Sequence, residues 1–148
     1  MYGYRFLVDN DCRRVKSLLP RALGLEDVGL SESALDEEII EAAADRLCII
    51  VTANGFDFVD KLNRFVAGST KKKSGCHDAS GLLVVPNDLA SQERLVLRAE
   101  GRLKLGDRRI TWRDVWRESL FVRIKRDEKH EVRPLPRCPT CVENLARG

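Results

Sequence analysis

The stretch Arg5-Phe-Leu-Val-Asp9 decides the fold, because it is a short apolar run that ends in an acidic residue. A continuous apolar run of this length is typical of a strand that is buried on both faces of a parallel sheet. In open parallel α/β sheets, ligands bind in the crevice beyond the carboxyl ends of the strands. The stretch therefore predicts a buried strand that carries the Asp9 carboxylate to the edge of the sheet where ligands bind.

Two later apolar runs extend the same pattern. Residues 47–51 are rich in β-branched side chains, and residues 81–86 contain Leu-Leu-Val-Val and stop at a proline. A weaker alternation over residues 25–30 predicts one short additional strand. Patterns typical of amphipathic helices cover residues 11–19, 36–47, 58–66 and 88–103. This alternation of strands and helices favours an α/β fold with a parallel sheet and helices on both of its faces.

The carboxyl-terminal part of the chain has a different pattern. Thr111-Trp-Arg-Asp114 resembles a capping box and predicts a short helix. Apolar and polar residues alternate over residues 119–126, which we expect to pair with residues 131–135 in a β-hairpin. We therefore expect an α/β domain over residues 1–105 and a helix-plus-hairpin extension over residues 106–148.

The composition is that of an ordinary globular protein. The chain has 148 residues, of which 43% are hydrophobic and 33% are charged. A chain of this length buries roughly 70% of its extended surface, which is enough for a single core. No apolar run approaches the roughly 20 residues of a membrane helix, and the first residues lack an apolar signal region. We therefore expect a cytoplasmic protein that has no membrane partner.

Charges are segregated along the chain, although the net charge is only +3. Residues 1–70 contain 8 Lys and Arg against 12 Asp and Glu, whereas residues 89–137 contain 14 against 8. One interpretation is a solvated surface with chance clustering. The other is an acidic site beside a basic surface that binds the phosphates of a nucleic acid. Both interpretations remain open at this point.

Two further groups of polar residues follow the predicted boundaries of secondary structure. Asp36, Glu37 and Glu38 open the second predicted helix, where acids also compensate the helix dipole. The loop after the strand at residues 47–51 contains Thr52, Asn54 and Asp57. A loop at the carboxyl end of a buried strand is where we expect site residues, although such a loop also caps the helix that follows. We expect these groups to converge with Asp9.

In their order and spacing, these segments resemble the PIN-like nuclease superfamily. The resemblance is to small bacterial PIN-like proteins, often toxins of toxin–antitoxin pairs, that begin with Phe-Leu-Val-Asp. The matching segments are residues 6–9, 35–39 and 50–58, and the resemblance covers about residues 4–100. It implies a Rossmann-like sheet whose acids bind Mg²⁺ or Mn²⁺ for the hydrolysis of RNA phosphodiesters. It also implies RNA as a binding partner and, for a toxin, an antitoxin protein.

Carried over residue by residue, the resemblance names the expected site. Asp9 matches the acid of the first strand, Asp36 or Glu38 matches the acid of the helix, and Asn54 with Asp57 matches the loop. Mg²⁺ takes one or two carboxylates and keeps several waters, so converging acids suit it. Asn54 departs from the pattern, because many relatives have Asp there. The alternative function is an inactive PIN-like module that binds RNA or protein, in which the acids serve helix capping and solubility.

The five cysteines divide into two groups. Cys12 and Cys48 lie in predicted core segments, where a thiol behaves as a small hydrophobic group. Cys138-Pro-Thr-Cys141 forms half of a zinc site, since structural zinc needs four ligands. Three interpretations remain open: zinc completed by Cys76 and His77, zinc shared between two chains of a homodimer, or plain thiols.

Overall fold

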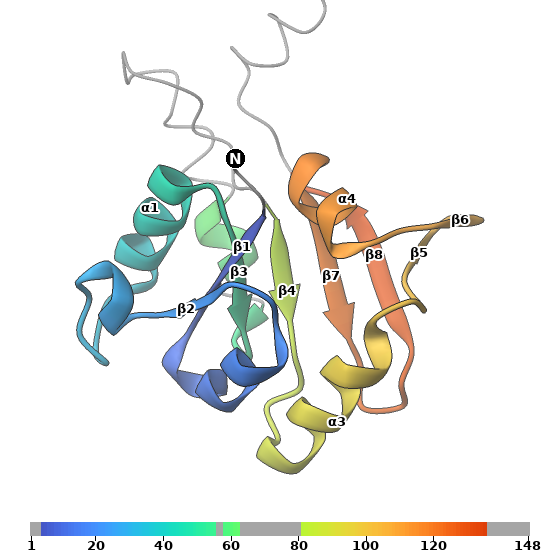
Figure 1. Ribbon diagram of the computed structural model, residues 1–148, viewed down its shortest axis with the longest axis horizontal. Helices are drawn as coiled ribbons and strands as arrows, with labels where there is room; N and C mark the ends of the chain where they lie inside the picture. Colours follow the sequence, from blue (N-terminus) through green and yellow to red (C-terminus); the bar gives the residue numbers. More distant parts are fainter. Residues whose placement is uncertain (1–3, 56–57, 63–80, 136–148) are drawn as a thin grey trace, which may run out of the picture.

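The computed structural model describes residues 4–55, 58–62 and 81–135 of the chain. A six-stranded sheet in the order β2-β1-β3-β4-β7-β8 forms its centre (Figure 1). The strands are β1 (Arg5–Val8), β2 (Ala22–Gly24), β3 (Cys48–Thr52), β4 (Leu82–Val84), β7 (Leu120–Ile124) and β8 (His130–Pro134). The first five are parallel, and β8 runs antiparallel to β7. The predicted α/β fold with a mostly parallel sheet is confirmed.

Helices cover both faces of this sheet and enclose two hydrophobic cores. The helices are the 3₁₀ helices η1 (Asn10–Leu18) and η2 (Glu26–Val28), the α-helices α1 (Asp36–Arg46), α3 (Leu89–Ala99) and α4 (Trp112–Arg117), and the helical residues 58–62. One core lies under η1, α3 and α4, and the other under α1 and residues 58–62. The strands β5 (Lys104–Leu105) and β6 (Arg108–Arg109) form a separate small hairpin beside β8 (Figure 1).

The strand β1 is buried on both faces, as its sequence predicts. Phe6 and Leu7 are both 0% exposed, but their side chains belong to different cores. Side chains of a strand alternate between the two faces of a sheet, so a strand covered on both faces must be apolar throughout. The adjacent strand β3 has the same pattern, with Ile49 in one core and Ile50 in the other.

The strand predicted over residues 25–30 is wrong in position. The strand β2 lies earlier, where Ala22 pairs with Phe6. After it the chain forms a turn, because the amide of Gly24 donates a hydrogen bond of 2.8 Å to Asp27 Oδ2. The turn is closed by Gly29, whose φ of 78° is readily adopted by glycine. Local side-chain hydrogen bonds therefore outweigh the weak alternation of this segment.

The carboxyl-terminal hairpin, expected as an addition to the α/β core, continues the main sheet. Leu83 of β4 pairs in parallel with Val122 of β7. The predicted capping box before it is confirmed, because the Thr111 amide donates to Asp114 Oδ2 at 2.8 Å and the Asp114 amide donates to Thr111 Oγ1 at 3.3 Å. The helix predicted over residues 88–103 ends earlier, at Ala99.

Other predictions concern single residues and membrane spans. Cys12 and Cys48 are free thiols and buried, as expected. Cys76, His77, Cys138 and Cys141 lie outside the described residues. In the described ranges, none of the helices has the length and apolar character needed to span a bilayer.

Gly81, directly before β4, lies in a tightly packed position between β3 and α4. Its carbonyl accepts a hydrogen bond of 3.0 Å from the Ile50 amide, and its φ is +133°. A Cβ at this position would lie 3.0 Å from both Cγ1 and the carbonyl oxygen of Val115. Gly101 has a φ of +82° with nothing near its Cβ position, so it isolates the backbone effect.

We expect Gly101→Ala to cost about 1 kcal/mol, as a left-handed backbone does for an L-residue. Gly81→Ala should cost at least about 1 kcal/mol more, because a buried contact is added to the backbone strain. Urea denaturation of both variants measures the difference. Equal losses of unfolding free energy would contradict the close packing of Gly81 against Val115 of α4.

Candidate functional site

The strand order defines one place in the sheet where two connections diverge. From β1 the chain crosses to β2 on one side, and from β3 it crosses to β4 on the other. Topological switch points of this kind leave an opening beyond the carboxyl ends of the two strands, and open α/β sheets bind ligands there. Asp9 directly follows β1, and Thr52 is the last residue of β3. The candidate site therefore begins with these two residues.

Thr52 fixes the orientation of the Asp9 carboxylate. The Thr52 hydroxyl is buried and donates a hydrogen bond of 3.1 Å to Asp9 Oδ2, while the Asn10 amide donates at 2.7 Å to Asp9 Oδ1. The backbone adds a further bond, from the Asp9 amide to the Val51 carbonyl at 2.8 Å. The amide of Asn54 also donates to Thr52 Oγ1, at 3.1 Å. One buried hydroxyl thus connects the carboxylate after β1 with the loop after β3.

Asp11 is a second carboxylate at this place, and our sequence analysis did not select it. The amide of Ala53 donates a hydrogen bond of 3.2 Å to Asp11 Oδ1, so the side chain points to the loop after β3. This contact arises because the chain turns directly from β1 into the 3₁₀ helix η1, which has a kink at Cys12. The spacing Asp9-x-Asp11 at the end of a buried strand is the signal that could have identified it.

The two carboxylates repel each other and are partly removed from water. Burial, and then the charge of Asp11, raise the pKa of Asp9 above its ordinary value. Asp11 is an exposed residue by surface area, yet burial is the main cause that raises the pKa of its carboxyl, with a further contribution from Asp36. In the part of the chain that the structure describes, neither carboxylate forms an ion pair with Lys or Arg. Bringing a cation to them would relieve both effects.

The other predicted site residues have different surroundings. Asp36 lies near enough to raise the pKa of both acids, but its Oδ2 is 2.8 Å from Lys61 Nζ. Glu38 Oε1 accepts a hydrogen bond of 2.9 Å from the Leu35 amide, so this carboxylate caps the start of α1. Asn54 is an exposed residue. Asp57 lies outside the described residues.

The donor set that the structure brings together suits a hard cation. Within residues 4–55, 58–62 and 81–135, no three His, Cys, Asp or Glu side chains are close enough together to hold a metal ion. Mg²⁺ nevertheless needs only one or two carboxylates, because it keeps several waters. Asp9 and Asp11 supply two carboxylates that lack a cationic partner among the described residues. These residues therefore fit Mg²⁺ or Mn²⁺.

The side chain of Gln92 supports the turn that carries Asp11. This side chain of α3 is 1% exposed, and its Nε2 donates to the carbonyls of Pro86 at 2.9 Å and Asp11 at 3.4 Å. Its Oε1 is buried without a hydrogen-bond partner among the described residues. Gln92 thus joins the end of β4 to the turn that carries Asp11, and sequence analysis did not select it.

Comparison with protein-family models finds no match for this chain, and comparisons with curated proteins and with solved structures find none either.

The raised pKa of Asp11 predicts how its substitution changes stability. A carboxyl whose pKa is higher in the native state binds its proton more tightly there, so its ionisation costs stability as the pH rises. In metal-free buffer at pH 7, Asp11→Asn should therefore raise the unfolding free energy, by up to about 1 kcal/mol because the group is partly screened by water. This gain should become smaller as the pH is lowered. It should vanish below about 3.9, the pKa of Asp in the unfolded chain, because Asp11 is then neutral in both the native and the unfolded state.

Urea denaturation at several pH values measures this effect, with the exposed Asp107→Asn as the matched control. A loss of stability at pH 7, or a gain that is independent of pH, would show that Asp11 is not held in an unfavourable ionised form.

Proposed function

We propose that this protein is a metal-dependent ribonuclease and that its sheet is a PIN-like variant of the Rossmann-like architecture. The observation that carries the proposal is the pair Asp9 and Asp11 at the switch point between β1 and β3. Two neighbouring carboxylates with raised pKa values are typical of functional sites, since a stable fold gains nothing from them. The resemblance of residues 4–100 to PIN-like nucleases adds the reaction and the substrate class.

Asp9 and Asp11 are the residues that would hold the metal, with Asp36 as the nearest further acid. When bound, Mg²⁺ or Mn²⁺ supplies a water of lowered pKa and neutralises charge on the leaving oxygen. The chain itself provides orientation. Thr52 holds Asp9 by its hydroxyl, and the Ala53 amide holds Asp11. Both supports belong to β3 and the loop after it, so one rigid strand positions both carboxylates.

Basic side chains beside the acids support an RNA substrate. Arg13 and Arg14 are exposed on η1, directly after the acids, and they line a shallow surface together with Lys16 and Arg21. Lys16 is already paired with Asp27 at 2.8 Å. The exposed arginines are suited to phosphate oxygens, which guanidinium groups bind in a bidentate manner. A phosphodiester held there would lie along η1, the helix that begins directly after Asp9.

The second candidate function is an inactive module that binds RNA or protein. Two observations favour it: Asp36 is neutralised by Lys61, and Glu38 caps its own helix. Both acids therefore have roles that need no metal. If the protein is a toxin, its partner would be an antitoxin protein, which the resemblance alone suggests.

Removing one carboxylate separates the two functions. We expect the unmodified protein to cleave mixed RNA when Mg²⁺ or Mn²⁺ is added and to stop when the metal is chelated. Loss of a residue that only supports a metal ligand typically reduces metal affinity or activity roughly 10–100-fold. Asp9 would be a ligand itself, so Asp9→Asn should reduce the rate of cleavage by at least about 100-fold. RNA affinity should be unchanged or higher, because a negative charge is removed.

The exposed Asp45→Asn on α1 is the matched control and should cleave normally. Cleavage is followed by gel electrophoresis, and affinity by fluorescence anisotropy with chelator present. RNA binding without metal-dependent cleavage in the unmodified protein would favour the binding module and contradict the nuclease proposal.

A further inference from the structure

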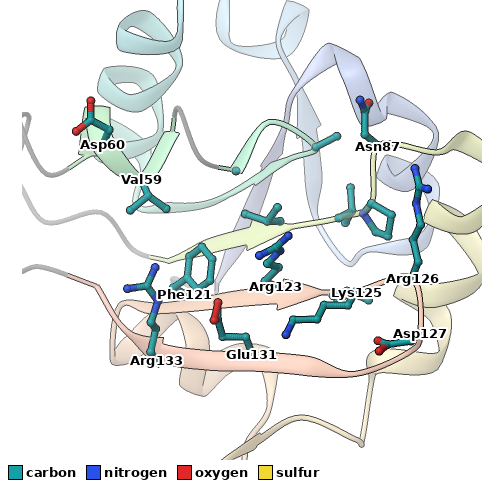
Figure 2. A pocket seen from close by; sticks show the side chains of 16 residues that line it. Val59, Asp60, Asn87, Phe121, Arg123, Lys125, Arg126, Asp127, Glu131 and Arg133 are labelled. Atoms are coloured by element: carbon teal, nitrogen blue, oxygen red, sulfur yellow. The ribbon is translucent and has the colours of Figure 1, made fainter.

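A pocket of about 760 Å³ opens beside the acidic site, over the half of the sheet formed by β4, β7 and β8. Figure 2 shows Val59 and Asp60 of the helical residues 58–62 on one side of the pocket and the strands β7 and β8 on the other. The volume falls within the roughly 300–1,000 Å³ that is typical of ligand pockets. We call this cavity the hairpin pocket, because β7 and β8 form its floor.

The register of the hairpin places long polar side chains on this floor. Phe121 lies opposite Arg133, and Arg123 lies opposite Glu131. Side chains of residues paired across antiparallel strands point to the same face. The guanidinium of Arg133 lies 4.6 Å from the centroid of the Phe121 ring, a cation–π contact that holds it at the edge of the pocket (Figure 2).

The lining of the hairpin pocket combines apolar side chains with cations. The apolar side chains are mainly Val59, Val84, Pro86 and Phe121. The cations are Arg123, Lys125, Arg126 and Arg133. A ligand that satisfies both kinds of side chain has a flat or apolar part and an anionic part. Nucleotides have this chemistry, because a base accepts apolar and guanidinium contacts on its faces and a phosphate accepts cations.

We propose that the hairpin pocket binds one unstacked nucleotide of a single-stranded RNA, with its base against the apolar side chains, one flanking phosphate on Lys125 and the other on Arg133. The inference deepens the proposed function, and it rests on RNA being the substrate. It names the form of RNA, because a base inside a duplex cannot enter a pocket without being unpaired.

The charge of the hairpin pocket favours a phosphodiester over a polyphosphate. Its lining contains the four cations together with the acids Asp60, Asp127 and Glu131, which gives a net charge of +1. A phosphodiester carries a single negative charge, whereas a nucleoside triphosphate would bring several charges near the three carboxylates. Like charges that face each other disfavour binding.

The position of the hairpin pocket connects it to the acidic site. Ala53 and Gly55 line the pocket. The amide of Ala53 also holds the Asp11 carboxylate. A strand that leaves a nucleotide in the pocket therefore passes the loop after β3 close to the two carboxylates. The pocket would fix the register of the RNA relative to the proposed point of cleavage.

The test uses the full chain and a fluorescein-labelled single-stranded RNA oligonucleotide in chelator, followed by anisotropy at several salt concentrations. Replacing two cations, Lys125→Gln with Arg133→Gln, should weaken binding about tenfold at low salt. Each phosphate contact in single strands contributes about 0.7 to the salt slope, so the slope should fall by about 1.4. The matched control is Lys104→Gln with Arg113→Gln, two exposed cations outside the pocket.

A second variant tests the apolar lining of the hairpin pocket independently of charge. Val59→Trp fills the pocket from the helical residues 58–62 and should weaken binding about fivefold or more, the low end for loss of one base contact. Its salt slope should stay unchanged. Circular dichroism shows whether each variant is folded, and metal-dependent cleavage of the unmodified protein is measured in parallel.

The outcomes separate this inference from the proposed function. Weaker RNA binding by both pocket variants supports the pocket, even if no cleavage is found. Competition by 5′-UMP or 5′-AMP at the same affinity as RNA would identify a free nucleotide as the ligand, and no competition would identify the strand. Normal binding by both folded pocket variants, with cleavage intact, would overturn the pocket and leave the nuclease proposal standing.

Discussion

The parallel pairing of β1 with β3 is the constraint on which the rest of the structure depends. Both strands are buried on both faces, so their backbones have no alternative hydrogen-bond partners in water. Their carboxyl ends must then lie side by side, and whatever follows each strand is brought together. Here the following residues are Asp9 and the loop that begins after Thr52. The hydrogen bond from the Thr52 hydroxyl to Asp9 is a direct consequence of this register.

The same constraint explains why the acids are unfavourable for stability. Burial raises the pKa of Asp9, and the neighbouring charge of Asp11 raises it further. The chain neutralises another acid close by, because Lys61 pairs with Asp36. In the described part of the chain, Asp9 and Asp11 have no such counter-ion. Hydrogen bonds from β3 and the loop after it nevertheless fix each of these two carboxylates. Two carboxylates that are fixed in position without a counter-ion among the described residues are consistent with a site that binds a cation.

The elements that could be predicted from sequence were those determined by local pattern. The apolar runs identified β1, β3 and β4, the acids of the first turn identified the start of α1, and the capping box identified the start of α4. Asp11 was missed because its position depends on a tight 3₁₀ turn that periodicity does not reveal. Gln92 was missed because one of its partners, the Asp11 carbonyl, is distant in sequence. The basic floor of the hairpin pocket depends on the pairing of β4 with β7, which no local pattern encodes.

Anomalous scattering from crystals soaked in MnCl₂, with Asp9→Asn crystals treated identically, shows directly whether Asp9 and Asp11 hold a metal ion. We expect an anomalous peak about 2.0–2.2 Å from carboxylate oxygens of Asp9 and Asp11, at distances near those of small divalent cations. The peak should be absent from the Asp9→Asn crystals. Saturating Mn²⁺ that leaves no peak at the ends of β1 and β3, or a peak that survives the substitution, would contradict a metal site built on these carboxylates.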